Sequence, residues 1–400
     1  GYDADEKARH FNVVARHSLE KKAAQYSDIF TTVSDITAQE CRQFLGRAVD
    51  VVTPNGFEPS FTPATEEEYE QKRAAARKKL VDVAAAMCGE DVPENALLVG
   101  IGGRYEWKNK GIDVFLESLK QLAASNINRD VLAVIAVPAA SMGAREDLVQ
   151  HLANGSAIDP AQKRYLTHHL EAEAWDQVSQ SIEGSILSTS ASRVKVLFVP
   201  TYLNGNDGIF NMPYYDMLAG VDLTIFASYY EPWGYTPLES VAYGVPTVTT
   251  TLAGFGMWIA KHADHEGVDI VRRDDYNERE VVLQITDVVR KYLDMSAEKY
   301  EAARPELSNK GMKDVDYVLT VRELAKMIKQ AGIRFTELPD EVFDDPFGEA
   351  ATGAGVIFGA TGGVMEAALR TAVETLTGEE LGSLEFSEVR GTQGVKEASY

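Results

Sequence analysis

Two glutamates, Glu231 and Glu239, lie eight positions apart in the stretch YYEPWGYTPLES. Between them are two aromatic residues, a glycine and two prolines, which predict a rigid turn leading into a helix. Thr236 is placed to cap that helix, followed by a proline suited to its first position and by Glu239 three residues after the cap. Backbone N–H groups at a helix start bind phosphate well. We therefore expect a phosphate at the turn, Glu239 near ribose hydroxyls, and Glu231 directed toward whatever the phosphate carries.

Each part of this motif also has a purely structural interpretation. Glu239 could act only as half of a capping box, which is about an even alternative from the pattern alone. Glu231 could be a solvated loop carboxylate, and that alternative is favoured about two to one before other motifs are weighed. The N–H groups of Gly234, Tyr235 and Thr236 fit either interpretation, because a cap and a phosphate use the same helix start.

A second cluster, GGRYEWKNKG, places Arg104 and Lys110 in one glycine-flanked loop. Two cations at this spacing can clamp a diphosphate and stabilise it as a leaving group. The alternative is a charged surface loop, which is common. Tyr214 and Tyr215 could stack on a base, although aromatic residues beside a sheet are more often part of a core.

The elements that must hold these motifs are short apolar runs alternating with helical segments, a pattern that predicts an α/β fold with a doubly wound parallel sheet. Ligands of such sheets bind beyond the carboxyl ends of the strands, and both motifs follow a predicted strand directly. The runs of strand length are LLVGIGG (97–103), VLAVIAVPAA (131–140), RVKVLFVP (193–200), VDLTIFAS (221–228) and VPTVTTT (245–251).

The first 60 residues predict a similar alternation. HFNVVARHSLEKKAAQYS has helical spacing, and DIFTTVS and VDVVTPNG have the character of strands. Between them, the residues from Thr37 to Glu40 match a capping box that would open the helix ECRQFLG. A charged, alanine-rich helix is expected over 66–87.

Composition limits the function classes. The 400 residues carry a net charge of −22, which disfavours nucleic acid as a partner. Two cysteines cannot build a disulfide framework, and no apolar run is long enough to span a membrane, so we expect a reducing, cytoplasmic location. The opening GYDADEKARH has no initiator Met or signal peptide, and we expect it to begin within a longer protein.

The motifs FTTVSDIT, VTPNGFE, GRYEWKNKG, VKVLFVPTYLNG and SYYEPWGYTPLES, in this order, resemble eukaryotic-type glycogen synthases of glycosyltransferase family 3. The resemblance covers about residues 5–300. It implies a GT-B fold with two Rossmann-like domains. It also implies retaining transfer of glucose from UDP-glucose to the 4-hydroxyl end of an α-1,4-glucan, without a metal or another cofactor.

The resemblance implies a role for each side chain of the two clusters. Arg104 and Lys110 would neutralise the leaving diphosphate. Glu231 would lie near the transferred glucose, and Glu239 would lie at the ribose. Tyr214 matches the position that stacks on uracil.

Backbone groups and the first region also acquire roles by this resemblance. The turn at Gly234, Tyr235 and Thr236 would bind the phosphates, and Asn55 of the PNG turn would lie near the glucose. Lys21 occupies a position where the family has an arginine facing the active site. A lysine keeps the charge there but loses the bidentate fork of the guanidinium.

The chain departs from the family in two respects. It lacks the opening strand and glycine-rich loop, so we interpret residues 1–60 as a remnant of the N-terminal GT-B domain and 61–300 as the C-terminal nucleotide-sugar-binding domain. For want of the missing loop the chain could be inactive, and this is the basis of the inactive-fragment alternative given below. The segment NEREVVLQITDVVRKYLDM has only scattered basic residues, so regulation by glucose 6-phosphate is not predicted.

Residues 301–400 have a different character. From about 298 the sequence resembles the catalytic domain of [FeFe]-hydrogenase, yet no cysteine follows Cys88 to hold its cluster, and we expect no hydrogenase activity. GVIFGATGGVMEAALRTA predicts a strand, a glycine-rich turn and a helix, without the order of a nucleotide-binding loop. Both resemblances are truncated near EKYEAARPE, which suggests an artificial fusion.

The leading hypothesis is thus a glucosyltransferase of glycogen synthesis, with UDP-glucose and glycogen or another α-glucan as its partners. One alternative is another GT-B glycosyltransferase with a different donor or acceptor. A second is an inactive fragment that only binds a nucleotide sugar or a glucan. The oligomeric state, including a homo-oligomer, is left open.

Overall fold

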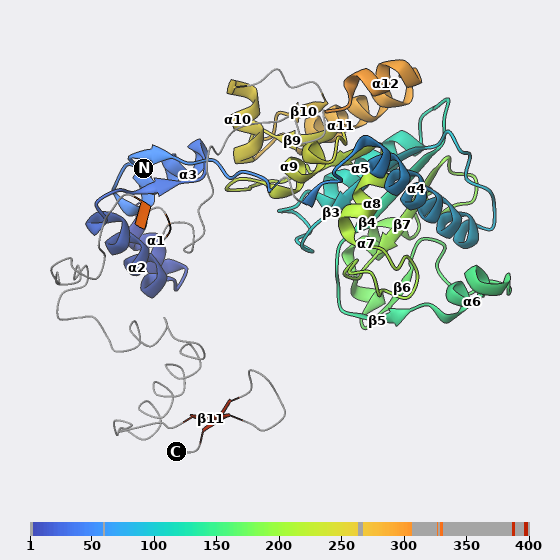
Figure 1. Ribbon diagram of the computed structural model, residues 1–400, viewed down its shortest axis with the longest axis horizontal. Coiled ribbons are helices and arrows are strands. Elements are labelled where there is room, and N and C mark those ends of the chain that lie inside the picture. The colour runs from blue at the N-terminus through green and yellow to red at the C-terminus, as the bar shows by residue number, and fades with distance from the viewer. Residues whose placement is uncertain are drawn as a thin grey trace. The chain divides into compact units, whose positions relative to one another are not determined.

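The computed structural model describes residues 3–58, 61–262 and 267–305, three positions between 326 and 330, and two short strands near the C-terminus (Figure 1). The chain divides into two compact units. The first unit comprises Gly1–Asp28 and Val321–Tyr400, and the second comprises Ile29–Thr320. The predicted domain boundaries at residues 60 and 300 stay predictions, and the predicted strand–turn–helix GVIFGATGGVMEAALRTA lies outside the described residues.

The first unit begins with two helices, of which the helical spacing of residues 10–27 predicts only the second. Helix α1 (Ala4–His10) starts at Asp3, whose side chain accepts a hydrogen bond from the Glu6 N–H. Helix α2 (Val14–Tyr26) follows after a turn in which Asn12 has a φ of +56°. Asparagine tolerates this left-handed conformation, which breaks the helical path. The two C-terminal strands, β11 (Phe386–Glu388) and β12 (Lys396–Ala398), pair antiparallel.

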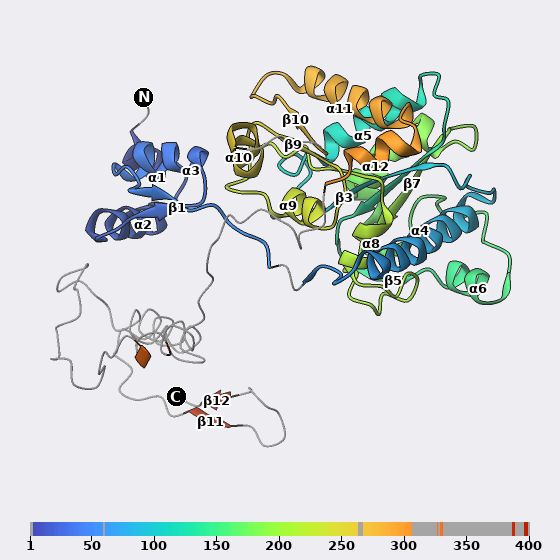
Figure 2. The same ribbon diagram turned by 45° about the horizontal axis from the view of Figure 1, so that its top comes forward.

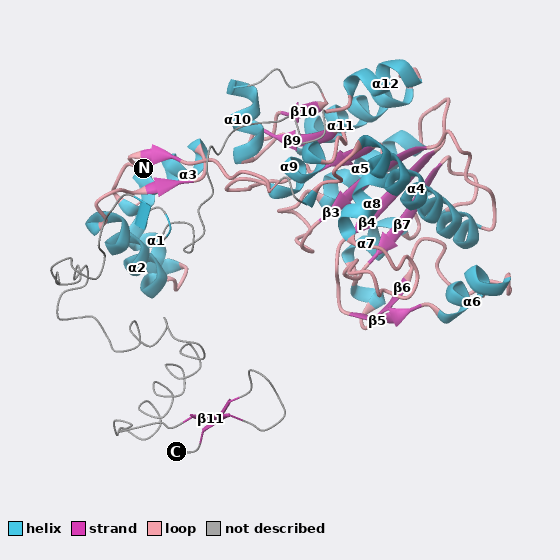
Figure 3. Cartoon of the chain, in the orientation of Figure 1, coloured by secondary structure: helices cyan, strands magenta, loops and turns pink. Residues whose placement is uncertain are grey.

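The second unit is built on a six-stranded sheet in the order β10-β9-β8-β3-β4-β7, in which every pair of neighbours is parallel (Figure 3). The predicted α/β class and parallel sheet are therefore confirmed. The five expected strands are present, and a sixth at VDIV was not predicted from the sequence. Their bounds are β3 (Leu97–Gly102), β4 (Val131–Ala136), β7 (Val194–Val199), β8 (Leu223–Ile225), β9 (Thr247–Thr250) and β10 (Val268–Val271).

Helices cover both faces of this sheet, as the doubly wound prediction requires (Figure 2). In β3, Leu97, Val99 and Ile101 pack into one core with α5 and α11, while Leu98 packs into the other with α4 and α8. Because side chains of one strand are buried on both faces of the sheet, the strands appear in the sequence as continuous apolar runs. The helices are α4 (Glu66–Cys88), α5 (Ile112–Ala123), α6 (Glu146–Asn154), α7 (Gln177–Ile182), α8 (Tyr214–Gly220), α9 (Tyr235–Ala242), α10 (Gly254–His262), α11 (Glu278–Leu293) and α12 (Ala297–Ala303).

Residues 29–58 contain the parallel pair β1 (Thr31–Thr32) and β2 (Val51–Val52), joined through helix α3 (Asp35–Glu40). The predicted capping box at Thr37–Glu40 is wrong. The box is formed by Ser34 and Thr37, whose side chains each accept the other's backbone N–H. Ser34 is extended and precedes the first helical residue, so the helix begins earlier than expected.

The remaining regular elements are short. A π-helical turn (Cys41–Leu45) continues α3. Strands β5 (Ser141–Ala144) and β6 (His168–Leu170) pair antiparallel, and two 3₁₀ turns cover Glu173–Trp175 and Ile186–Ser188. Within the described part of the chain, we find no helix with the length and apolar character that crossing a bilayer requires.

A buried carboxylate fastens α4 to the sheet just before β8. Asp222 accepts hydrogen bonds from Arg73 at 2.6 Å, from Arg77 at 2.8 and 2.9 Å, and from the Leu98 N–H at 2.8 Å. The Asp222 side chain is only 6% exposed. Removing one partner of such a buried network leaves charges without compensation.

We expect Asp222→Asn to lower the free energy of unfolding by about 3 kcal/mol, because an amide donor would face the N–H donors of the two arginines. Asp216→Asn is the matched control: Asp216 pairs with Lys72 at 2.7 Å, and its side chain is 30% exposed. That change should cost under about 1 kcal/mol. Urea unfolding of both variants measures the difference, and equal losses would contradict a special role for Asp222.

Candidate functional site

The two predicted motifs meet at the carboxyl edge of the sheet. The loop 103–111 follows β3, and the turn 226–234 follows β8, which is hydrogen-bonded to β3. The backbone N–H of Tyr229 donates to the carbonyl of Asn109 at 2.7 Å, so the two segments are joined directly. Parallel neighbouring strands bring their following loops together, and this edge is where ligands of such sheets bind.

Glu231 and Lys110 form an ion pair at this junction. Their side chains are 12% and 15% exposed, respectively. The Ser228 hydroxyl also donates to the Glu231 carboxylate at 3.3 Å. Glu231 is therefore not a solvated loop carboxylate. A charged substrate that reaches this junction could therefore pair with either the Glu231 carboxylate or the Lys110 ammonium.

Arg104 lies at the other end of the loop and lines a cavity of about 370 Å³. Its guanidinium pairs with Glu106 at 2.9 Å, and its side chain is 75% exposed. Tyr214 and Thr236 line the same cavity. The remaining lining residues follow the ends of β3, β4 and β7 or lie at those ends, and are Gly103, Tyr105, Ala136, Pro138, Thr201, Tyr202 and Leu203.

Helix α9 starts differently from the sequence prediction. Gly234 is the residue before the helix, with φ +104°, and Tyr235 is its first residue. The predicted cap at Thr236 is therefore wrong, and Glu239 is not part of a capping box. The reason is the left-handed conformation at Gly234, which turns the chain into the helix two residues earlier than predicted. No side chain caps α9, so its first N–H groups remain available to an anion.

The Glu239 side chain contacts the preceding helix, α8, instead of the start of its own helix, α9. The Tyr215 hydroxyl donates to its carboxylate at 3.0 Å. Burial raises the pKa of Glu239 above its ordinary value of 4.5, and the Tyr215 hydrogen bond only partly opposes that shift. Tyr215 in turn stacks on Tyr243, with ring centroids 5.2 Å apart.

The raised pKa means that the folded state holds the Glu239 proton more tightly than the unfolded chain. Its stabilising contribution is complete below the ordinary value of 4.5 and is lost as pH rises through the folded-state pKa. Glu239→Gln has no charge to bury, so we expect its melting temperature at pH 7.5 to exceed that of the parent by about 1–2 °C.

A pH series of thermal unfolding tests this expectation. The exposed Glu280 supplies the control Glu280→Gln, for which the melting temperature should not change. A lower melting temperature for Glu239→Gln at pH 7.5 would contradict the prediction.

Tyr214 is the better placed of the two adjacent tyrosines to face a ligand. Its ring packs against Gly102, where an added Cβ would lie 2.8 Å from Tyr214 Cε2. Burial raises the pKa of its hydroxyl. Tyr214 lines the cavity, while Tyr215 is occupied by Glu239 and Tyr243.

Two predicted residues are not brought to this cavity by any contact of the described structure. Asn55 is partly buried in the loop after β2. Lys21 lies on α2 in the first unit, where its ammonium contacts both carboxylate oxygens of Asp5 at 2.8 Å. The proposed roles of these two residues stay predictions.

Sequence reasoning missed Tyr202, Tyr105 and Ser228. Tyr202 follows the end of β7 in VKVLFVPTYLNG, so the rule that ligands bind at carboxyl strand ends contained the signal. Tyr105 donates to Asp176 at 2.5 Å and accepts from the Val178 N–H at 3.1 Å. Those contacts depend on tertiary structure and leave no local signature.

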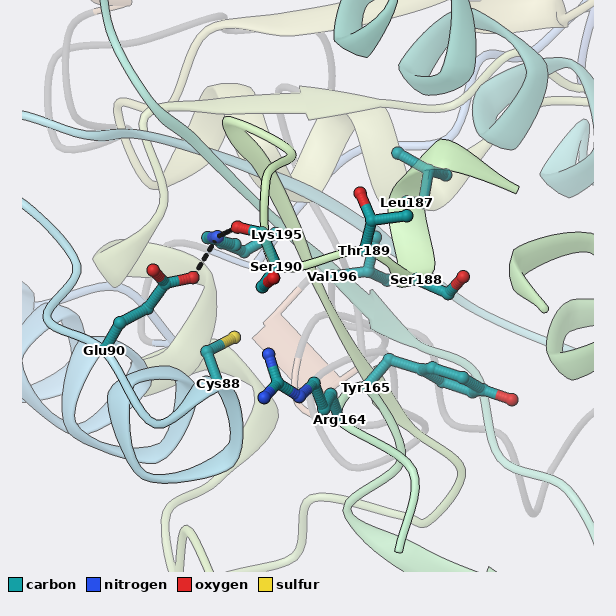
Figure 4. A pocket seen from close by; sticks show the side chains of 10 residues that line it. All are labelled: Cys88, Glu90, Arg164, Tyr165, Leu187, Ser188, Thr189, Ser190, Lys195 and Val196. Carbon is teal, nitrogen blue, oxygen red and sulfur yellow. Dashed lines mark hydrogen bonds and ion pairs between the residues drawn. The ribbon is translucent and has the colours of Figure 1, made fainter. Parts of the chain in front are cut away.

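A second, smaller pocket lies near the start of β7 (Figure 4). Its volume of about 20 Å³ has room for about one water, so it does not fit a sugar nucleotide. Lys195 there pairs with Glu90, beside Cys88 and Arg164. Across the described residues, no group of three or more His, Cys, Asp or Glu side chains is arranged to hold a metal ion.

Comparison with known families gives two matches. The family described as Glycogen synthase matches residues 1–153 and 160–331, beyond the limit near 300 inferred from the motifs. The family described as Iron only hydrogenase large subunit, C-terminal domain, matches residues 296–400. That segment contains no cysteine, so its residues do not fit the thiolate-bound cluster that the family name implies.

Individual proteins are also similar to this chain. Glycogen [starch] synthase isoform 1 of Saccharomyces cerevisiae is 30% identical over 362 residues, covering 73% of this chain and 51% of that protein. The liver glycogen [starch] synthase of Mus musculus is 30% identical over 317 residues, covering 65% and 45%. The catalytic domain of starch synthase IV from Arabidopsis thaliana is 16% identical with a TM-score of 0.41, covering 78% and 56%. The chain thus spans about half the length of the curated relatives it matches.

Proposed function

The chain belongs to the glycogen synthase family, and from this premise we propose that it transfers glucose from UDP-glucose to the 4-hydroxyl end of an α-1,4-glucan. The observation that carries the proposal is the Glu231–Lys110 pair, which lies at the same carboxyl edge of the sheet as the cavity lined by Arg104, Tyr214 and Thr236. Family membership also implies the GT-B type of fold and retention at the anomeric carbon.

The proposed donor is assigned one orientation at this edge of the sheet, as follows. The uracil stacks on Tyr214 and the ribose reaches Glu239. The diphosphate lies at the uncapped start of α9, at Gly234, Tyr235 and Thr236, where N–H groups and the helix dipole favour an anion. The glucose then lies toward Glu231.

In the transfer, the bond between glucose C1 and the β-phosphate oxygen breaks, and a bond forms from C1 to the acceptor 4-oxygen. The acceptor proton is released, and UDP leaves with the bonding electron pair. Arg104 and Lys110 neutralise the charge that develops on the diphosphate. Lys110 changes its partner from Glu231 to the phosphate as the donor binds. Glu231 is then able to accept hydrogen bonds from hydroxyl groups of the glucose and to stabilise positive charge near C1.

This proposal needs no metal or other cofactor, because two side-chain cations and a helix start supply positive charge at the diphosphate. A cytoplasmic location is proposed on the low number of cysteines. The hydrogenase-like segment is proposed to be without hydrogenase activity, because it has no thiolate to hold the cluster.

Incorporation of labelled glucose into glycogen tests the function directly, with UDP-glucose and ADP-glucose compared as donors. Turnover with UDP-glucose supports the proposal, and a preference for ADP-glucose overturns the proposed donor. Binding of UDP without turnover favours the second candidate, a nucleotide-sugar-binding fragment, which is consistent with a chain spanning about half of its relatives. Absence of both activities overturns both candidates.

We also propose that the synthase-like and hydrogenase-like parts are joined artificially. The support is that the two family matches overlap over residues 296–331. A single genomic read across codons 290–310, with normal coverage, would overturn this proposal. Separate reads that each continue into a whole synthase or a whole hydrogenase would support it.

A further inference from the structure

Arg273 is a buried cation that contacts the turn after β8, where the two motifs meet. It follows β10 and is 6% exposed. Its guanidinium donates to the carbonyl of Ala227, and it lies 5.3 Å from the centre of the Tyr229 ring. Both partners belong to the turn that leads from β8 to Glu231.

The backbone of Arg273 is fixed independently of its side chain. Its N–H donates to the Thr251 hydroxyl at 3.0 Å, and its carbonyl accepts from the same hydroxyl at 3.2 Å. The guanidinium therefore extends from a backbone that is held by Thr251 to the turn that leads to Glu231.

The carbonyl of Ala227 also contacts the Lys110 loop. Gly111, the next residue after Lys110, has φ +71°, and a Cβ added there would overlap this carbonyl. The Tyr229 N–H donates to Asn109 on the other side of Lys110. Lys110 is thus bracketed by two contacts with the segment that Arg273 holds.

Carboxylates on helices α5 and α11 balance the charge of Arg273. Burial lowers the pKa of Arg273, and the nearby carboxylates of Asp113 and Glu278 oppose that shift. Asp113 lies in the first turn of α5, and neither of its buried carboxylate oxygens has a hydrogen-bond partner. Burial raises the pKa of Asp113, and Arg273 opposes that shift too.

We propose that Arg273 is a positioning residue, which fixes the Ala227 carbonyl and the Tyr229 ring and thereby sets the geometry of the Glu231–Lys110 pair. The catalytic consequence rests on the proposed glucosyl transfer, whereas the structural consequence does not. Sequence reasoning did not select Arg273 for this role, because the residue lies outside both motifs.

Amide hydrogen exchange of the full chain tests the structural part. In Arg273→Met, amides of residues 226–232 should exchange at least about 10-fold faster, while those of β4 stay within about 2-fold of the parent. Arg273→Lys keeps a charge opposite Asp113 but lacks the fork and the planar stacking surface of the guanidinium. The exchange rates over 226–232 in this variant should therefore lie between those of the parent and of Arg273→Met. Arg272→Met changes the exposed neighbouring arginine and is the matched control, with no expected effect.

Kinetics with UDP-glucose tests the catalytic part. Arg273→Met and Arg273→Lys should lower kcat by about 100-fold and about 10-fold, respectively, because small displacements of reacting groups have effects of this order. The dissociation constant for UDP should change less than about 3-fold, since uracil and ribose contacts are untouched, whereas general unfolding would weaken kcat and binding together.

Unchanged exchange over 226–232 in both variants overturns the proposal, as does an equal rise in all segments. If the parent chain shows no transfer, the proposed function fails, and the exchange pattern alone still decides the role of Arg273. If the methionine variant does not fold, the lysine variant carries both measurements.

Discussion

Glu231→Gln should lower kcat for glucose transfer about 1,000-fold while leaving the dissociation constant for UDP within about 3-fold of the parent. Glutamine keeps the shape of the side chain but removes the negative charge. That charge is needed near C1 as positive charge develops in the transition state. UDP lacks the glucose that Glu231 would face, so its binding reports only on the rest of the site.

Steady-state kinetics with UDP-glucose and calorimetry with UDP give the two quantities. Glu298→Gln is the control, because Glu298 is an exposed glutamate on α12. A kcat within about 5-fold of the parent would show that the Glu231 carboxylate does not take part in the reaction. A parallel loss of UDP affinity would instead point to a distorted phosphate site.

Lys110→Met should lower kcat/KM by about 1,000-fold and, unlike the glutamate change, also weaken UDP binding by about 10-fold or more. The variant removes a cation from the proposed diphosphate site. It also leaves the Glu231 carboxylate, which is 12% exposed, without its partner. The two effects act in the same direction, since an uncompensated carboxylate repels the phosphates.

Lys108→Met is the matched control for this prediction. Lys108 lies in the same loop with its side chain 72% exposed, and it approaches Asp113 no closer than 3.8 Å. Its loss should leave kcat/KM within about 2-fold of the parent. The double variant of Lys110 and Glu231 should lose much less than the product of the single effects, because the two residues act as a unit. Independent, multiplying effects would refute the functional pairing.

The sequence alone determined the positions of five of the six strands of the sheet and of the loops proposed to carry the chemistry. Buried parallel strands have apolar side chains on both faces. Runs such as LLVGIGG and VLAVIAVPAA could therefore be recognised as strands without knowing which strands they pair with. The polar clusters that follow two of these strands had to lie at one edge of the sheet. Arg104, Lys110, Glu231 and Glu239 could therefore be selected as candidates from residue type and local spacing.

Helix starts were less predictable, because they depend on the conformation of a single residue. Thr37 and Thr236 both have the right side chain for a cap. The caps are nonetheless Ser34, which is extended, and Gly234, which is left-handed. Several nearby residues of suitable type compete for such a position, and the surrounding packing selects among them.

Only the tertiary structure decided which candidates contact one another. Lys110 and Glu231 are 121 residues apart, and they meet because β3 and β8 are neighbours in a sheet whose order is not the order of the sequence. The same order brings Tyr215 to Glu239 and places Arg273 under the Ala227 carbonyl. Residue type and spacing act over a few positions along the chain. Ion pairs and buried hydrogen bonds depend on distance in space, and the strand order sets that distance.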